Sequence, residues 1–279
     1  MALKIEAVGH QTEPIEHEYD WKDVVLYALG VGARVDLELD LLYEKRGPRV
    51  LPTYAVVPVW PALHQLVDAV GGDFLGVVHM GQSIRLHRPF ESSGRLTSVG
   101  EVAGVYDLKR MATAIFRTTT HDADGQLVSE TEMSILFRFD GGFGGPKPPR
   151  EPRQVIPERA PDFRFEDETQ PEQAALYRLS GDLNPLHIDP ETAVKAGFDK
   201  PILHGLCTYG HVGRAVVRGA CGGDPSRLTA LRGQFRKPVL PGETLITEGW
   251  VEGSEVIVRT ATSERPDEYV FSGATAEIR

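Results

Sequence analysis

The chain has 279 residues, of which 41% are hydrophobic and 25% charged, so its composition is globular and too apolar for a disordered protein. The formal net charge of −10 argues against a nucleic-acid partner, because binding phosphates along a strand needs clustered lysines and arginines. No apolar run approaches the ~20 residues that cross a bilayer, and two cysteines are too few for a disulfide framework. The first residues lack the pattern of a secretory signal and the last are not a peroxisomal address. We therefore expect a cytoplasmic protein that binds neither nucleic acid nor a membrane.

The first half of the chain predicts a helix and, further on, strands. Residues 20–33 (DWKDVVLYALGVGA) place apolar side chains at the i, i+3, i+4 and i+8 positions of one helix face. Between Met133 and Phe139, apolar residues alternate with Ser134 and Arg138, which is the period-two pattern of a strand. A helix that precedes strands is therefore expected in this half.

Residues 140–161 are the best candidate for a boundary between two domains. The segment DGGFGGPKPPREPRQVIPERAP holds six prolines and four glycines, which neither a helix nor a central strand tolerates. We therefore expect an N-terminal domain over 1–139, a linker over 140–161 and a C-terminal domain over 162–279.

The second half repeats the order of a helix followed by strands. Residues 205–223 predict a helix that stops at a glycine pair, and residues 255–262 and 269–279 predict two strands separated by the turn formers of 263–268. The halves also share an echo, because Pro89 and Pro238 each follow a basic residue and each precede a leucine, Leu96 or Leu245, by seven positions. This order favours a duplicated protein of the α+β class.

The stretch YRLSGDLNPLHIDP (residues 177–190) is the strongest candidate for a site. Asp182, Asn184 and His187 fall close together, and Gly181 and Pro185 favour a fixed loop over a helix interior. A carboxylate, an amide and an imidazole in one loop could hold a water molecule and exchange protons with it. The alternative is structural, with the Asp and Asn side chains making Asx-type turn bonds while the imidazole covers the core.

A second feature is the pair His204-Gly205, which precedes the helix expected from residue 205. A glycine at a helix start leaves backbone N–H groups open to a developing oxyanion. His204, Cys207 and His211 could share one helix face, which invites a metal or a thiol-nucleophile interpretation. Their spacing matches no common closed zinc site, and no dinucleotide, P-loop or nucleophile-elbow motif occurs, so we expect no metal and no cofactor.

The same residues carry a resemblance to a known family. YRLSGDLNPLHIDP followed by AGFDKPILHGLCTYG closely resembles the hydratase 2 signature of the MaoC-like, (R)-specific enoyl-CoA hydratases, which include the hydratase part of the peroxisomal multifunctional β-oxidation enzyme. The similarity continues through YALGVGA, LPTYAVVP and GGFGG in the first half and KPVLPGETL in the second. It implies a double hot-dog fold, in which each of two domains wraps an antiparallel sheet around a long helix, and a homodimer.

The resemblance implies the roles of the central residues. Asp182 and His187 would be the catalytic pair that holds the water, and Asn184 would orient it. The backbone N–H of Gly205 would bind the thioester oxygen in its enolate-like state. This chain departs from the family pattern at residues 79–82 (HMGQ for HGEQ), 107–109 (DLK for DKG) and 234–235 (QF for RF), which bears on substrate preference more than on chemistry.

Five further positions are candidates for substrate binding. By resemblance, Arg178 would support the carboxylate, and Tyr27 and Glu44 match family positions near the site. Arg236 and Lys237, adjacent in FRKPVLPG, are the candidates for the CoA phosphates on grounds of charge, and the alternative is that they are the solvated end of a strand.

The expected reaction is the reversible hydration of trans-2-enoyl-CoA to (R)-3-hydroxyacyl-CoA, with CoA as part of the substrate. One alternative is an acyl-CoA thioesterase on the same fold, which would direct water at the carbonyl carbon instead. The other is a binding module for acyl-CoA or an acyl carrier that carries out no catalysis.

Overall fold

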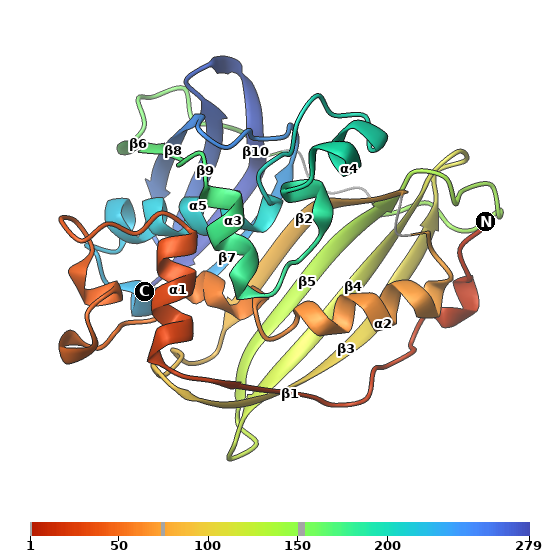
Figure 1. The fold of residues 1–279 in the computed structure, drawn as a ribbon, viewed down its shortest axis with the longest axis horizontal. Helices are drawn as coiled ribbons and strands as arrows, with labels where there is room; N and C mark the ends of the chain where they lie inside the picture. Colours follow the sequence, from red (N-terminus) through yellow and green to blue (C-terminus); the bar gives the residue numbers. More distant parts are fainter. Residues whose placement is uncertain (1, 74–75, 150–153) are drawn as a thin grey trace.

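A computed structural model describes residues 2–73, 76–149 and 154–279, and these residues form one ten-stranded sheet (Figure 1). The order across the sheet is β1-β3-β4-β5-β2-β7-β10-β9-β8-β6, and every neighbouring pair is antiparallel. The strands are β1 (Ile15–Tyr19), β2 (Val77–Leu86), β3 (Gly94–Asp107), β4 (Ala112–Asp122), β5 (Leu127–Phe137), β6 (Phe163–Glu168), β7 (Leu228–Phe235), β8 (Thr244–Glu252), β9 (Glu255–Thr262) and β10 (Arg265–Ile278).

Helices lie against this sheet in both halves of the chain (Figure 1). They are α1 (Trp21–Gly30), α2 (Trp60–Val70), α3 (Gln173–Tyr177), α4 (Pro190–Lys195) and α5 (Gly205–Ala220). Short 3-10 turns connect them, of which η3 (Glu44–Arg46), η4 (Pro52–Val56), η6 (Arg178–Ser180) and η7 (Pro185–His187) matter below. The mixture of helices and an antiparallel sheet confirms the α+β class.

The strand order is symmetric about the junction of β2 with β7. On each side the order runs second, fifth, fourth, third and first strand of that half, so the two halves repeat one topology. The junction is a regular ladder from Gly81↔Gln234 to Arg85↔Ala230. Pro89 and Pro238 both lie just beyond the junction strands, and Leu96 and Leu245 are both buried near the start of the next strand. The topology therefore agrees with the duplication that the echo suggested.

The two long helices of the halves differ in their burial. Helix α2 packs on β3 and β4 and buries one face, through Ala62, Leu63, Leu66, Val67 and Val70. Helix α5 is buried on all sides from Leu206 to Val217, because the second half of the sheet lies on one side of it and η4 and the segment after α1 lie on another. Two glycines permit this approach, since a Cβ at Gly210 would lie 2.3 Å from a Val31 side-chain carbon and one at Gly213 would lie 2.6 Å from Thr53. Helix α5 is thus a central buried helix, packed between elements of both halves.

The structure confirms both predicted helices as α1 and α5, and it confirms strands at 133–137 and 255–262 within β5 and β9. It corrects one turn, because β10 already begins at Arg265, inside the segment expected to separate two strands. Helix α2 was not predicted. The described residues of the proposed linker, 140–149 and 154–161, form neither helix nor strand, and residues 150–153 lie outside the described part.

Polar contacts tie the two halves together around α5. The fully buried guanidinium of Arg214 donates to the carboxylate of Glu38 and to the carbonyl oxygen of Val31. The side chain of Gln173 donates to the carbonyl oxygen of Gly30, 2.6 Å away. In the described part of the chain, no helix has the length and apolar character needed to span a bilayer.

Candidate active site

The segment between α3 and α4 places Asp182 and His187 through two short turns. Gly181 ends η6 with a φ of 125°, a backbone conformation that favours glycine, and Pro185 begins η7. The backbone N–H of Asn184 donates to Asp182 Oδ1 at 3.1 Å, and that of Leu186 donates to Asn184 Oδ1 at 3.0 Å. The Asx-type bonds of the structural alternative therefore do form. They also fix the loop that presents the carboxylate and the imidazole.

His187 is 9% exposed, and its ring is held in one tautomer. Its Nδ1 lies 2.8 Å from the carbonyl oxygen of Ile202, and because a carbonyl oxygen only accepts hydrogen bonds, Nδ1 carries the proton. The lone pair of the neutral ring is then on Nε2, which is available to accept a proton from water.

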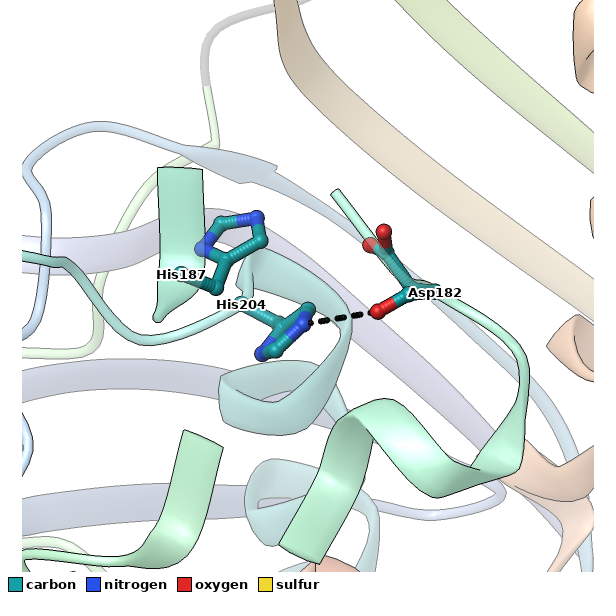
Figure 2. A group of neighbouring side chains, drawn as sticks. All are labelled: Asp182, His187 and His204. Carbon is teal, nitrogen blue, oxygen red and sulfur yellow. Dashed lines mark hydrogen bonds between the residues drawn. The ribbon is translucent and has the colours of Figure 1, made fainter. Parts of the chain in front are cut away.

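Asp182 is 8% exposed and lies beside a second imidazole, His204 (Figure 2). His204 Nε2 is 3.2 Å from the backbone oxygen of Asp182, and the ring stacks on His187 with centroids 3.8 Å apart and planes inclined by 30°. One ligand atom from each of Asp182, His187 and His204 lies within 4.8 Å of the others. Because a water that bonds two atoms at about 2.8 Å each bridges up to about 5.5 Å, the group has the spacing to hold one water.

Burial perturbs the pKa values of all three side chains. Desolvation raises the pKa of Asp182 to about 7, although the Asn184 N–H and the charge of Arg178 act in the opposite direction. Desolvation lowers the pKa of His187 to about 4 against the opposing hydrogen bond to Ile202. The pKa of His204 falls to about 2, through desolvation first and then the neighbouring His187. A carboxyl group that titrates near neutrality beside a neutral imidazole is suited to acid–base chemistry.

Gly205 begins α5 directly after His204, so the helix N-terminus lies next to the Asp182–His187 pair. The first N–H groups of a helix have no partner within it and carry its positive dipole end. A Cβ at Gly205 would lie 3.4 Å from ring carbons of Phe235, the last residue of β7. Arg236 and Lys237 follow at once and are exposed, with Lys237 Nζ 4.0 Å from Glu268 and Arg236 Nε donating to Ser272. Two exposed cations therefore directly follow Phe235, the residue whose ring adjoins Gly205.

Arg178 and Tyr27 contact the loop and the aromatic rings that adjoin the pair. Arg178 donates to the carbonyl oxygen of Leu183, which closes the loop. Its charge opposes the rise in the pKa of Asp182 that burial causes. Tyr27 is 1% exposed, and its ring is 6.2 Å from that of Tyr177, which in turn is 4.9 Å from His204. Tyr27 thus packs among the buried rings next to the site, and its role in substrate binding stays a prediction.

The role expected for Glu44 in substrate binding stays a prediction. Glu44 is an exposed residue of η3, and its neighbours along the chain contact the other end of α5: Glu38 pairs with Arg214, and Arg49 pairs with Asp224. Helix α5 has 16 residues and so is about 24 Å long. The neighbours of Glu44 along the chain therefore pair with residues of α5, and of the segment after it, that lie away from Gly205.

A metal site and a reactive thiol fit the geometry less well. Cys207 is fully buried, donates to the carbonyl oxygen of Gly30, and has its pKa raised by burial, so its thiol stays protonated. His211 contacts Arg214 and is not part of the group around Asp182. Asp182, His187 and His204 could supply ligand atoms, but stacked rings hold their in-plane lone pairs side by side rather than aimed at one ion.

Sequence reasoning placed Asp182, Asn184, His187 and Gly205 in one site, and the structure brings these residues together. It missed His204 as a partner of the pair and Phe235 as a neighbour of Gly205. The only available signal was position, since His204 directly precedes Gly205 and Phe235 precedes the two cations.

Comparisons with known proteins cover both halves of the chain. Residues 17–139 match the family described as "MFE-2 hydratase 2 N-terminal domain", and residues 153–269 match "MaoC like domain". The chain is 41% identical to 3-hydroxyacyl-thioester dehydratase Y of Mycobacterium tuberculosis, over 93% of this chain and 92% of that protein. It is 37% identical to the peroxisomal enoyl-CoA hydratase 2 of Arabidopsis thaliana, over 92% of this chain and 90% of the relative.

Solved structures agree with these sequence matches. A MaoC-like dehydratase from Phytophthora capsici superposes with a TM-score of 0.87 and 31% identity, covering 99% of this chain and 98% of the other. A protein of Mycobacterium tuberculosis described as having a double hotdog fold superposes with a TM-score of 0.61 at 16% identity, which supports the fold alone. The expected double hot-dog architecture is thus confirmed. With relatives this similar over nearly its whole length, the chain belongs to the MaoC-like hydratase 2 family.

Proposed function

We propose that this protein adds water across the double bond of a trans-2-enoyl-CoA to give (R)-3-hydroxyacyl-CoA, and that it catalyses the reverse reaction. The observation that carries the proposal is the buried pair of Asp182 and His187 beside the N-terminus of α5. The activity agrees with the names of its relatives, an enoyl-CoA hydratase 2 and a 3-hydroxyacyl-thioester dehydratase.

The mechanism follows from the protonation states of the pair. A water held between the Asp182 carboxylate and His187 Nε2 loses a proton to one of them as its oxygen bonds to C3 of the substrate. Electrons of the C2–C3 double bond move toward the thioester, whose oxygen becomes enolate-like and accepts a hydrogen bond from the Gly205 N–H. C2 then takes up a proton from the pair, so the site ends with the protons it began with. Because the two groups titrate as a unit, the proton belongs to the pair.

The neighbourhood of the pair supports a CoA thioester as the substrate. Arg236 and Lys237 are exposed close to Phe235 and the α5 N-terminus, where they would meet the CoA phosphates. Arg178 would stabilise the Asp182 loop, and Asn184 would orient the water with its remaining amide protons. Neither a metal nor a redox cofactor takes part in this mechanism. We further propose a homodimer that acts in the cytoplasm, although its relatives include peroxisomal proteins.

One assay separates hydration from the two alternatives. Crotonyl-CoA is mixed with the enzyme while the enoyl absorbance is followed, with Ellman reagent present to detect free thiol. Loss of absorbance without thiol indicates hydration, and chiral analysis of the product gives its hand. Release of thiol would indicate a thioesterase, and tight binding without either change would indicate a binding module. Either of these last two outcomes, or an (S) product, contradicts the proposal.

A further inference from the structure

We infer that His204 is a positioning residue that fixes Asp182 and His187 relative to each other, by donating a hydrogen bond to the Asp182 backbone and by stacking on the His187 ring. The inference rests on the proposed function, because it concerns the same acid–base pair. In Figure 2 the His204 ring lies below the other two side chains, with its bond drawn toward Asp182.

The hydrogen bond joins two segments that the sequence keeps apart. His204 Nε2 lies 3.2 Å from the Asp182 carbonyl oxygen, so Nε2 must carry the proton. His204 is the residue before α5, and Asp182 lies in the loop between η6 and η7. The bond therefore ties the loop that carries the carboxylate to the helix end that carries the Gly205 N–H. Distances between acid, base and oxyanion donor matter because a misplacement of about 1 Å can cost a catalytic site about 100-fold in rate.

The stack fixes the other member of the pair. Among the described residues, the His187 ring makes one hydrogen bond, from Nδ1 to the carbonyl oxygen of Ile202, and this contact alone would allow the ring to swing. The His204 ring lies against its face at 3.8 Å between centroids and is itself backed by Tyr177 at 4.9 Å. The stacked His204 ring, with the Tyr177 ring packed on it at an inclination of 53°, leaves His187 little freedom to rotate, so Nε2 keeps its direction toward the water.

His204 is unsuited to act as an acid or base itself. It is fully buried, and the ionisable groups around it are His187, Asp182, Arg178 and Tyr177. Its low pKa keeps the ring neutral over the range in which the pair works. Its Nδ1 is buried and has no hydrogen-bond partner in the described part of the protein. An unpaired buried nitrogen destabilises a fold, so His204 is a poor choice for stability alone. Its contacts with Asp182 and His187 account for an imidazole at this position.

Two substitutions separate the hydrogen bond from the stack. His204→Phe keeps an aromatic face against His187 but has no N–H for Asp182, whereas His204→Gln places an amide N–H near the position of Nε2 without a ring. For His204→Phe we expect kcat to fall at least tenfold with KM changed less than about twofold. Loss of the N–H leaves the Asp182 carboxyl in a more apolar environment, so the limb of the pH–kcat profile that reports its ionisation should move to higher pH. His204→Gln should return that limb toward the wild-type position.

His211→Phe is the matched control, since it removes another buried imidazole of α5 that contacts Arg214 instead of the pair. It should leave the limb in place whatever its effect on the amount of folded enzyme. A His204→Phe profile that is only scaled down, with the limb unmoved, contradicts the inference, because loss of folded enzyme alone produces that result. So does unchanged kcat.

Nitrogen chemical shifts of the wild-type enzyme provide a second test that needs no variant. His204 should be protonated on Nε2, unprotonated on Nδ1, and neutral down to at least pH 5. A proton on Nδ1, or titration near pH 6, overturns the inference even if His204→Phe fails to fold. Wild-type enzyme that does not hydrate crotonyl-CoA instead overturns the proposed function, and the tautomer then still decides whether the bond to Asp182 exists.

Discussion

The N-termini of α2 and α5 occupy corresponding places in the two halves but begin with different residues. Helix α2 begins with Trp60 and Pro61 after the fully buried Val59. Its first turn therefore carries a bulky indole ring and a proline nitrogen that has no N–H to donate. Helix α5 begins with Gly205 after His204, with no side chain on its first residue. The segment before α5 carries Asp182 and His187, whereas the one before α2 carries no such pair.

The comparison shows how one topology serves two purposes. The first half uses its helix start for packing, since Trp60 contacts both hydrophobic cores of the molecule. The second half has a glycine at the same place, next to the buried ionisable side chains of Asp182, His187 and His204. A few residues at a helix start thus separate a packing element from a catalytic one, while the surrounding sheet stays the same.

The largest effect should come from removing the pair that the first half lacks. Asp182→Asn and His187→Gln each abolish proton exchange with the water, and general acid–base groups typically contribute about 10²–10⁴-fold. We expect kcat for crotonyl-CoA hydration to fall by that range in each variant, with the circular dichroism spectrum unchanged. Full hydratase rate in either variant would sink the assignment of the pair.

The next effect should come from making the start of α5 resemble that of α2. Gly205→Pro removes one N–H, and the fold should accept it because His204 has φ −57° and ψ 135°, which suits a residue before proline. Loss of one oxyanion donor typically lowers kcat by about 10²–10³-fold. Gly205→Ala keeps the N–H and meets Phe235 at an ordinary contact distance of 3.4 Å, so it should retain most of the rate. Equal rates in the two variants would show that this N–H is not the donor.

The smallest effect concerns stability. The buried carboxyl of Asp182 should lower the free energy of unfolding as the pH rises. The folded-state pKa of Asp182 is raised to about 7, whereas an unfolded Asp ionises near 3.8, so between these values the unfolded chain ionises first and folding loses free energy with increasing pH. We expect Asp182→Asn to gain about 2.5 kcal/mol in unfolding free energy relative to wild type from pH 5 to pH 7.5. His187, whose pKa is lowered, weakens both proteins alike below about pH 6.5. Urea titrations at the two pH values measure the difference, and parallel stabilities would contradict the raised pKa.

The site was predictable to the extent that it is local in the sequence. Asp182, Asn184 and His187 share one loop, so spacing and loop chemistry sufficed, and Gly205 was found from its place at a helix start. His204 was not, because its bond to Asp182 and its stack on His187 depend on how two segments fold back on each other. The roles of Tyr27 and Glu44 stay predictions, since similarity of a position to a family pattern gives no distance to the site.

The class of the fold and its two halves were predictable from the sequence, but the ladder that joins the halves was not. Amphipathic spacing identified α1 and α5, and alternation identified β9. Helix α2 was missed because Pro61 and Trp60 obscure its start, although its apolar spacing is regular. The pairing of β2 with β7 joins strands about 150 residues apart, and no local pattern specifies such a ladder.

The two halves of the chain are joined twice: covalently through residues 140–161, and by the backbone hydrogen bonds of the ladder between β2 and β7. A protease that cut among residues 154–161, which form neither helix nor strand, would break the backbone, yet the sheet would still run from β1 to β6. Were the pieces to part, each would expose an unpaired strand edge, and the contacts of Arg214 with Glu38 and of Gln173 with Gly30 would be lost. The two fragments should therefore remain associated after cleavage, as the subunits of a heterodimer do.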